Sequence, residues 1–388
     1  MPEGPVVVAL ASELKGNAYL AECKRQGYRV VVVMDSKLEA EPWPWEAMDE
    51  HFGMPDVSRQ PDVTYAVSYL ARSRRVALVV GLDDYDVEVA ASLREHLRLP
   101  GLGDTRARLF RDKIAIRVRA SERGLPVPPF TGLFNDAAVN AFLAEVPPPW
   151  VLKPRTLAGS EGVRKLYDAG SVWRELERLG DGRSLHLLEQ FIPGAVYHVD
   201  GLCWQDEVVF ALASGYGEPP MSVLQNRGIF TTQVLPRRDG LAQDLLDLNA
   251  RVLSALGRGS GPTHTEFIRA EDGKLYFLET AARVGGGNIE LLVEAASGVL
   301  LWQEAARIDI ALHRSEPYAP PELREACAGL IACFSRVPYA DTSGYTEPEI
   351  RYRPRAAETV TLVVAAAQQA RVEALLASYA LRFRHEFM

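Results

Sequence analysis

The chain has 388 residues, of which 47% are hydrophobic and 24% charged, and its net charge at pH 7 is −8. This balance is typical of a soluble protein of two or three domains, and an acidic chain without basic runs disfavours binding to nucleic acid or to an anionic membrane. No apolar run in the sequence approaches the roughly 20 residues of a membrane span. The N-terminus lacks the basic segment of a signal peptide, and the cysteines lack CxxC spacing, so we expect a cytoplasmic protein with free thiols.

The N-terminal region alternates apolar runs with amphipathic helical patterns. Strand-like runs lie at 5–10, 28–34 and 76–82, and helical patterns lie at 14–26 and 84–97. Continuous apolar runs of this kind predict a parallel sheet with helices on both faces. The Pro- and Trp-rich stretch 41–56 predicts a surface loop. On this alternation of strands and helices we assign 1–103 to an N-terminal Rossmann-like domain. No GxGxxG follows the first run, so the domain lacks the sequence fingerprint of dinucleotide binding.

Residues 104–124 predict one long helix that begins at Asp104 and ends at Gly124. Lys113 lies on this helix, where a lysine commonly belongs to a solvated face. The segment 125–130 then predicts an extended linker into a smaller α+β unit. We therefore place the first domain boundary in this region.

A lysine and a loop of small residues follow in the smaller unit. Lys153 lies inside an apolar strand pattern, where an unpaired ammonium group is costly, so we expect it to meet an anion. The loop 156–162 contains Gly159, Ser160 and Gly162, and such residues let backbone N–H groups close around phosphate oxygens. Most small-residue loops between strands are plain turns, so the loop alone leaves both interpretations open.

A glutamate occupies the next apolar strand pattern. Glu189 lies between Leu187 and Phe191 on one face of that strand. One interpretation is a glutamate of an edge strand that points to water. The other is a carboxylate, or an adjacent backbone carbonyl, that accepts a hydrogen bond from the amino group of adenine, with Phe191 and Ile192 nearby.

The segment 263–280 predicts a β-hairpin, because Asp272-Gly273 separates two alternating apolar runs and favours a two-residue type I′ turn. That turn sets Glu266 opposite Glu279. Directly opposed carboxylates repel, so the pair requires a raised pKa, a cationic side chain or a metal ion between them. Hard divalent ions such as Mg²⁺ prefer carboxylate oxygens and often share them with substrate phosphates. The alternatives are a slipped register or a solvated face.

An arginine and a run of glycines follow the hairpin. Arg283 comes soon after Glu279, and Gly285, Gly286 and Gly287 permit a tight backbone turn into the next helix. An arginine beside a metal-bound phosphate stabilises the charge that develops on a transferring phosphoryl group. The other interpretation is a surface arginine followed by a helix-entry turn.

In this order and spacing, the motifs resemble the ATP-grasp superfamily, and more narrowly its carboxylate–amine ligases. The matching segments are RDK with Lys113, VLKP with Lys153, the loop 156–162, LEQFIPG with Glu189, and HTEF with FLETAARVGGG, which contain Glu266, Glu279 and Arg283. The resemblance implies an α/β and α+β protein, with an ATP-grasp fold and an N-terminal parallel α/β (pre-ATP-grasp) domain. The implied divisions are 1–103 for that domain, 104–185 for the small subdomain with its linker helix and phosphate lid, 186–315 for the large subdomain with the metal site, and 316–388 for a C-terminal segment that completes or covers the ATP-grasp domain.

The resemblance also implies where ATP and a metal ion would bind. In the implied scheme Lys113 and Lys153 hold the phosphates, Gly159, Ser160 and Gly162 close over them, Glu189, Gln190, Phe191 and Ile192 read adenine, and Glu266 and Glu279 bind Mg²⁺ or Mn²⁺. Family members transfer the γ-phosphoryl group to a carboxylate, and an amine then attacks the acyl phosphate to give an amide, ADP and phosphate. The implied catalytic residues are Arg283, which steadies the acyl phosphate and the tetrahedral intermediate, and Lys153.

The sequence departs from the family pattern at two positions. Val196 stands where many relatives have a ribose-binding glutamate, and Ala281 stands where many have a metal-binding asparagine. His264 lies opposite Ala281 in the predicted register, so we expect His264 or Asn288 to compensate in part.

The favoured function is an ATP-dependent ligase that joins a small carboxylate to an amine, with amino acids as the expected substrates. Arg227, Gly286 and His264 are the candidate substrate contacts. Two alternatives stay open, namely a biotin- or bicarbonate-dependent ATP-grasp carboxylase and a non-catalytic nucleotide-binding protein of the same fold. Most proteins of this type are dimers, so a homodimer is compatible with the resemblance.

Overall fold

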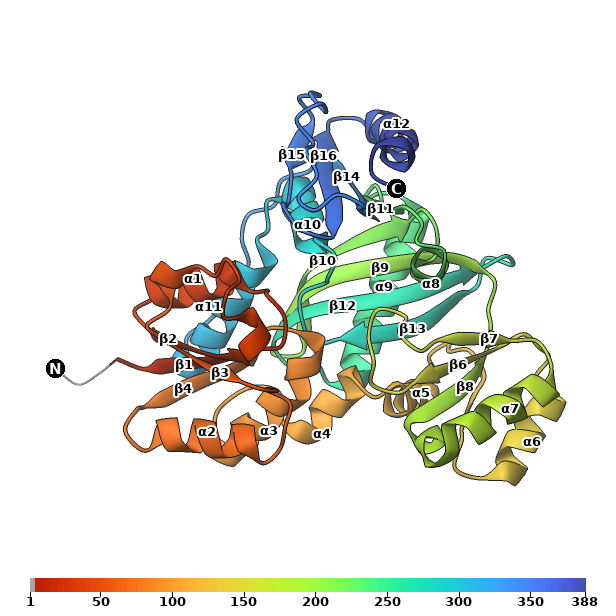
Figure 1. Ribbon diagram of the computed structural model, residues 1–388, viewed down its shortest axis with the longest axis horizontal. Coiled ribbons are helices and arrows are strands. Elements are labelled where there is room, and N and C mark those ends of the chain that lie inside the picture. The colour runs from red at the N-terminus through yellow and green to blue at the C-terminus, as the bar shows by residue number, and fades with distance from the viewer. Residues whose placement is uncertain (1–3) are drawn as a thin grey trace.

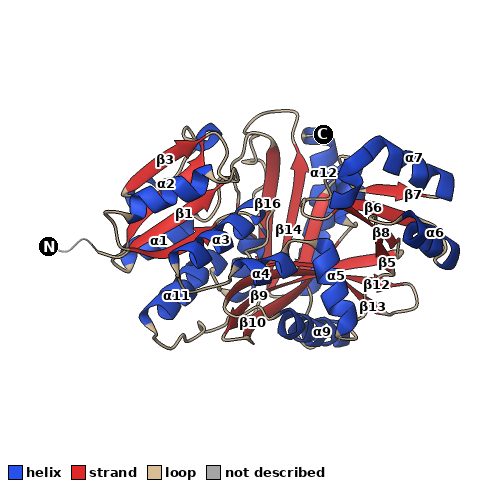
Figure 2. Ribbon diagram, turned by 90° about the horizontal axis from the view of Figure 1, so that it is seen from below, coloured by secondary structure: helices blue, strands red, loops and turns tan. Residues whose placement is uncertain are grey.

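The computed structural model describes residues 4–388, so the first three residues of the predicted N-terminal domain lie outside the described residues. The strands form a four-stranded sheet near the N-terminus, an eight-stranded sheet and a second four-stranded sheet. The large sheet lies between the two smaller ones (Figure 1), and the view from below shows those two at opposite ends of the molecule (Figure 2). Among residues 4–388, every helix is too short or too polar for a membrane crossing.

The N-terminal sheet is parallel throughout, with the strand order β3-β2-β1-β4. Its elements are β1 (Val6–Ala11), β2 (Arg29–Asp35), β3 (Glu50–Met54) and β4 (Val76–Gly81), with helices α1 (Asn17–Arg25), α2 (Asp62–Ala71) and α3 (Val87–Leu97). Val7 and Val8 pack in separate cores on opposite faces, which explains the continuous apolar runs and confirms the predicted parallel sheet. The expected loop at 41–56 is wrong in part, because β3 forms an edge strand there.

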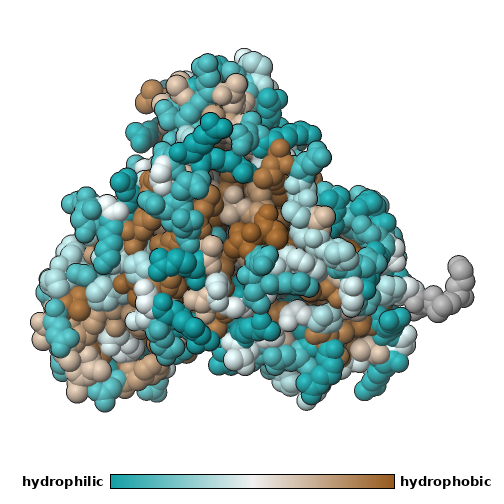
Figure 3. Space-filling model, turned by 180° about the vertical axis from the view of Figure 1, so that it is seen from behind, coloured by the Kyte–Doolittle hydropathy of each residue, from teal (hydrophilic) through white to brown (hydrophobic). Residues whose placement is uncertain are grey.

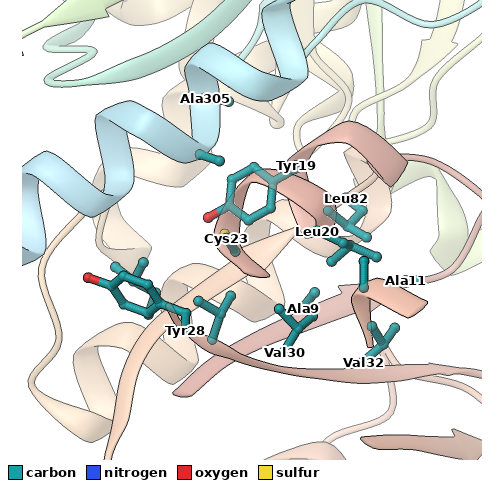
Figure 4. Close-up of a cluster of buried hydrophobic side chains, with 14 of the residues drawn as sticks. Ala9, Ala11, Tyr19, Leu20, Cys23, Tyr28, Val30, Val32, Leu82 and Ala305 are labelled. Carbon is teal, nitrogen blue, oxygen red and sulfur yellow. The ribbon is translucent and has the colours of Figure 1, made fainter. Parts of the chain in front are cut away.

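One face of this sheet packs against a helix from a distant part of the chain, α11 (Leu301–Arg314). The shared core includes Ala9, Val30, Tyr19, Cys23 and Ala305 (Figure 4). Tyr19 also donates a hydrogen bond from Oη to Asp309 on α11 at 2.7 Å. Each large apolar side chain buried here contributes about 1.5–3 kcal/mol, so this core fixes the N-terminal domain against the rest of the molecule.

The small sheet has the strand order β5-β8-β6-β7. Its elements are β5 (Phe130–Gly132), β6 (Trp150–Pro154), β7 (Arg164–Leu166) and β8 (His186–Gln190), covered by α6 (Asp136–Glu145) and α7 (Ala169–Leu179). β8 is a central strand that pairs with both β5 and β6. Because β8 belongs to this sheet, we place the end of the small subdomain after Gln190 instead of at 185.

The large sheet has the order β13-β12-β9-β10-β11-β14-β16-β15. Its strands are β9 (Gly194–Trp204), β10 (Glu207–Tyr216), β11 (Phe230–Val234), β12 (Gly261–Ala270), β13 (Leu275–Ala281), β14 (Cys327–Phe334), β15 (Ile350–Tyr352) and β16 (Thr359–Ala366). Helix α9 (Gly240–Leu256) covers one face, α10 (Ile289–Ser297) packs on the other, α12 (Gln369–Glu386) packs on β14 and β16, and the short α8 (Pro220–Gln225) precedes β11. Because β14 pairs with β11, residues after 315 extend the sheet that carries the hairpin.

The expected single helix over 104–124 is wrong. The structure has a short α4 (Asp104–Ala107), a 3-10 turn and a separate α5 (Lys113–Glu122). Asp112 interrupts the pattern, because its carboxylate caps α5 by accepting hydrogen bonds from the backbone N–H groups of Ile114 and Ala115 at 3.0 and 3.4 Å. Lys113 is therefore the first residue of a helix.

The predicted hairpin is present, but its turn differs from the prediction. The backbone N–H of Ala270 donates to the carbonyl of Lys274 at 2.9 Å, so the loop is residues 271–273, and its last residue, a glycine, has a left-handed φ of 85°. A bulge beyond the turn shifts the register back, and Glu266 then lies opposite Glu279. The two-residue turn is therefore wrong, whereas the opposition of the two glutamates is confirmed.

Candidate active site

A cavity of about 570 Å³ lies where the N-terminal sheet, the loop 156–162 and the large sheet meet. Its walls include the loops after β1 and β4, the start of α5, the hairpin β12–β13, helix α8 and strands β11, β14 and β16. β1 has β2 on one side and β4 on the other, so the loops at the carboxyl ends of β1 and β4 bound the switch point where open parallel sheets bind ligands. The view from behind shows hydrophobic residues gathered in a hollow between the lobes (Figure 3).

The two opposed glutamates lie on the wall of this cavity, and each has a partner of its own. Tyr216 donates a hydrogen bond from Oη to Glu266 Oε1 at 2.8 Å, and Lys113 Nζ lies 3.3 Å from Glu279 Oε2. Burial raises the pKa of Glu279, but the ammonium groups of Lys113 and Lys153 lower it by a larger amount. The net pKa is therefore below its usual value, and the carboxylate is ionised at neutral pH. Two opposed glutamate side chains on a cavity wall fit a hard divalent cation, which prefers carboxylate oxygens.

Lys113 does not lie on a solvated face, because only 9% of the residue is exposed. Its ammonium group donates to the carbonyl oxygen of Leu157 at 2.7 Å and also contacts Glu279. It therefore connects the start of α5 to the loop 156–162 and to the hairpin.

The loop 156–162 lies over the same cavity. Its residues Gly159, Ser160 and Gly162 have left-handed φ values of 63°, 58° and 70°. Glycine adopts this conformation without strain, whereas Ser160 adopts it at a cost. Successive peptide groups in such a conformation can direct their N–H groups toward one anion. Leu157 through Ser160 line the cavity together with Lys113 and the two glutamates, and the backbone carbonyl of Leu157 accepts a hydrogen bond from Lys113.

Lys153 lies in a buried charge cluster beside the cavity. Its ammonium contacts Glu189, and Arg117 lies against the other oxygen of that carboxylate, with Nε and Nη2 at 3.1 and 3.0 Å. Burial lowers the pKa of Lys153, and the neighbouring Glu189 opposes this only in part. One carboxylate thus serves two buried cations, and the excess positive charge favours an anion nearby.

This geometry also decides between the interpretations of Glu189. The residue is 3% exposed and lies on the central strand β8, so the solvated edge-strand glutamate is wrong. Lys153 and Arg117 both contact its carboxylate, so of the two acceptors expected from the sequence for an adenine amino group, the adjacent backbone carbonyl is the one that stays a prediction. The ring of Phe191 lies 3.4 Å from the ammonium of Lys165. Among the described residues, those that line the cavity do not include Lys153, Glu189 or Phe191.

Arg283 is held from a different domain. Its Nη2 donates to Asp84 Oδ2 at 2.5 Å, while Arg111 Nη1 lies 3.0 Å from the other oxygen of Asp84. Burial raises the pKa of Asp84, but Arg283 and Arg111 hold it well below the usual range. Asp84 was missed in the sequence, although an acidic pair directly after a buried parallel strand marks the carboxyl edge of the sheet, where ligands bind.

A buried polar network continues from the hairpin into the large sheet. His264 lies opposite Ala281, as predicted, and its Nδ1 lies 2.9 Å from Asp200 Oδ1, while His198 Nδ1 lies 2.6 Å from the other oxygen of Asp200. Burial lowers the pKa of His264, but Asp200 and Glu266 together raise it to about 10. The ring Nε2 of His264 lies 3.7 Å from Glu266. His198 and Asp200 were missed, although polar residues two apart in the apolar strand β9 share one face.

The other predicted contacts divide between the cavity and its surroundings. Gly286 and Asn288 line the cavity, and the amide of Asn288 donates to Thr361 Oγ1 at 3.4 Å. Arg227 is not among the described lining residues, and its guanidinium lies 5.4 Å from the ring centre of Phe334.

No protein-family model matches the chain. An L-arginine-specific L-amino acid ligase of Bacillus subtilis is 24% identical over 242 residues, which cover 60% of this chain and 57% of that protein. D-alanine–D-alanine ligase of Neisseria gonorrhoeae is 26% identical over 212 residues, which cover 51% of this chain and 65% of that protein. The chain therefore matches these relatives over less than two thirds of their length.

A solved structure matches over nearly the whole chain. The L-amino acid ligase from Bacillus licheniformis superposes with a TM-score of 0.75 at 18% sequence identity, and the match covers 97% of both chains. At this identity the likeness establishes the fold and leaves the chemistry to the side chains of the site.

Proposed function

Because the chain has the ATP-grasp fold, we propose that it is an ATP-dependent carboxylate–amine ligase that forms an amide through an acyl phosphate and releases ADP and phosphate. One observation carries the proposal above the others. Glu266 and Glu279 lie directly opposite each other on the wall of a cavity that is also lined by Lys113 and Arg283. Both relatives named above are amino-acid ligases, which supports amino acids as the substrate class.

Each charged group has a separate role in the proposed reaction. Glu266 and Glu279 hold Mg²⁺ or Mn²⁺, which when bound neutralises charge on the transferring phosphoryl group. Lys113 and Lys153 hold the phosphates of ATP. The loop 156–162 closes over them and excludes water, so the γ-phosphoryl group reaches the acid instead of being hydrolysed.

The reaction then proceeds in two steps. A carboxylate oxygen of the acid forms a bond to the γ-phosphorus while the bond from that phosphorus to the leaving oxygen of ADP breaks. The amine nitrogen next forms a bond to the carbonyl carbon, phosphate leaves, and the nitrogen loses a proton. Arg283 stabilises the negative charge in both steps, because its guanidinium is held toward the cavity by Asp84.

The direct test measures ADP release with ATP, Mg²⁺ and pooled amino acids, followed by mass spectrometry of the products. ADP together with a new amide-linked mass is the expected result. ATP binding without ADP release from any combination of acid and amine would contradict the proposal and favour a nucleotide-binding protein without ligase activity.

Lys153→Met is expected to weaken ATP binding roughly tenfold to a hundredfold, since it removes a charged hydrogen bond to a phosphate. The fold is expected to survive, because Arg117 and Glu189 remain as a balanced buried pair. Calorimetric titration with ATP measures the change, with Lys274→Met at the exposed hairpin tip as the control. Unchanged ATP affinity would refute the phosphate role of Lys153.

Asp84→Asn is expected to lower kcat about tenfold to a hundredfold, because a poorly held Arg283 no longer meets the reacting phosphoryl group correctly. The Michaelis constant for ATP is expected to stay constant, since Lys113 and Lys153 hold the phosphates in the proposed scheme. Asp62→Asn on the exposed surface of α2 is the matched control. A variant with normal kcat would show that Asp84 does not position Arg283.

A further inference from the structure

We propose that the acid substrate is a carboxylic acid with a large apolar side chain, such as an apolar α-amino acid, and that Lys15 and Arg283 together bind its carboxylate. This inference rests on the proposed ligase function and specifies the acyl donor. It follows from the division of the cavity into a cationic end and an apolar end.

The cationic end lies around Gly286. A methyl group added to Gly286 would lie 3.9 Å from Lys15 Nζ and 3.9 Å from Arg283 Nη1, with nothing closer. The bare glycine thus leaves a small open space within reach of both an ammonium and a guanidinium group. A carboxylate fits such a space, and a guanidinium matches its two oxygens.

Lys15 lies at the wall of the cavity beside the parallel sheet. Lys15 follows β1 and ion-pairs with Asp83, which follows β4, so the pair spans the two loops at the switch point of the parallel sheet. A third of the Lys15 side chain, 32%, is exposed. The ammonium is therefore anchored by Asp83 and still open to a ligand.

The apolar end is built by three neighbouring strands of the large sheet. Phe230 on β11 pairs with Ala332 on β14, and Ala332 pairs in turn with Thr361 on β16. Directly paired residues of antiparallel strands point to the same face, and all three line the cavity. Thr361 is the polar member of the three, and its hydroxyl accepts a hydrogen bond from Asn288. Val223 of α8 closes this end from above the sheet.

The distribution of charge decides which acids fit. Among the described residues, the lysines and arginines that line the cavity are Lys15, Arg111, Lys113 and Arg283. All of them belong to the cationic end, and no charged residue of the described lining comes from α8, β11, β14 or β16. The same end also carries the carboxylates of Glu13, Asp83, Asp84, Glu266 and Glu279. An acidic side chain on the substrate would lie against Phe230 and Ala332, where no described lysine or arginine lines the cavity. Its burial there is costly, whereas an apolar side chain gains from burial.

The acyl donor can be identified without knowing the amine. Hydroxylamine attacks any acyl phosphate, phosphate leaves, and a stable hydroxamate remains. The assay measures hydroxamate and ADP with ATP, Mg²⁺ and, one at a time, L-leucine, L-phenylalanine, glycine, L-glutamate and L-lysine. We expect kcat/KM for leucine or phenylalanine to exceed that for glycine by roughly tenfold to a hundredfold, from burial of the side chain, and to exceed that for glutamate by more.

Two variants test the carboxylate site. Gly286→Ala places a methyl group in the open space, and Lys15→Met removes the ammonium, so each is expected to raise KM for the acid about tenfold or more while KM for ATP stays constant. The controls are Gly240→Ala, where an added methyl meets nothing within 4 Å, and Lys24→Met on the exposed surface of α1. A normal KM for the acid in both cavity variants would overturn the carboxylate site.

The outcomes separate this inference from the proposed function. Hydroxamate from glutamate or lysine at rates equal to those from leucine would overturn the apolar acyl donor and leave the ligase function standing. Hydroxamate and ADP from none of the acids, together with no ADP release from any acid and amine, would instead contradict the ligase function itself. Ala332→Phe adds a check, since it fills the apolar end and is expected to abolish the preference for phenylalanine over glycine.

Discussion

Glu279→Gln is expected to lower kcat/KM about 10³-fold or more, because the loss of one anionic ligand removes several kcal/mol of charge stabilisation by the metal ion. The chain should stay folded. A glutamine oxygen still accepts a hydrogen bond from Lys113, and the repulsion between Glu279 and Glu266 disappears with the charge. The defect therefore belongs to the reaction and not to the stability of the protein.

The dependence of this variant on the metal ion distinguishes a ligand from a general acid or base. A weakened metal site is expected to regain part of its activity at high Mn²⁺ concentration, whereas a lost proton donor or acceptor would not. ADP release measured across a series of Mn²⁺ concentrations provides the comparison, with Glu271→Gln at the exposed hairpin tip as the control. Full activity of Glu279→Gln at low metal concentration would contradict the proposed role of Glu279 as a metal ligand.

The hairpin shows how a local error and a correct site can coexist in a sequence prediction. Asp272-Gly273 predicted a two-residue turn, but the loop is residues 271–273, and this alone would move Glu266 away from Glu279. The bulge in the ladder restores the opposition. Alternation of apolar residues predicts which face is buried, but turn length and bulges depend on the packing of β12 against β9, which the hairpin sequence does not contain.

The prediction of one helix over 104–124 was wrong for a related reason. Its pattern of charged and apolar residues is compatible with one helix, and only Asp112 signals the break, because aspartate is also a common N-cap. The side chain of Asp112 is fixed by Arg155, which is distant in the sequence. The consequence matters for the site, since the break turns Lys113 into the cavity instead of onto a solvated face.

Local motifs therefore predicted charged groups that line the cavity, namely Lys113, Glu266, Glu279 and Arg283, whereas the residues that hold them could be identified only from the fold. Asp84 reaches Arg283 across 199 positions of sequence, and the network of His198, Asp200 and His264 joins two strands that pair only in the folded sheet. None of the matching motifs lies after residue 315, yet residues of β14 and β16 line the cavity. The pairing of strands that are distant in the sequence places these residues, and this pairing cannot be predicted from any single segment.

Arg283→Met is expected to lower kcat about 10³-fold, the range seen when an arginine that stabilises phosphoryl transfer is removed. ATP binding should change little, because Lys113 and Lys153 hold the phosphates in the proposed scheme. The fold should also persist, since Asp84 keeps its ion pair with Arg111 after Arg283 is lost. Arg269→Met on the exposed part of β12 is the control for removal of a positive charge.

Arg283→Lys makes the test sharper, because it separates charge from shape. A lysine keeps the positive charge but lacks the planar fork that contacts Asp84 and the reacting oxygens at the same time, so its kcat should lie between those of the wild type and Arg283→Met. Single-turnover measurement of ADP formation isolates the phosphoryl step from product release. If instead Arg283→Met weakened ATP binding in proportion to its loss of kcat, Arg283 would be a nucleotide ligand. Asp84 would then position the nucleotide, so the contact between the N-terminal sheet and Arg283 would control affinity instead of the rate of the chemical step.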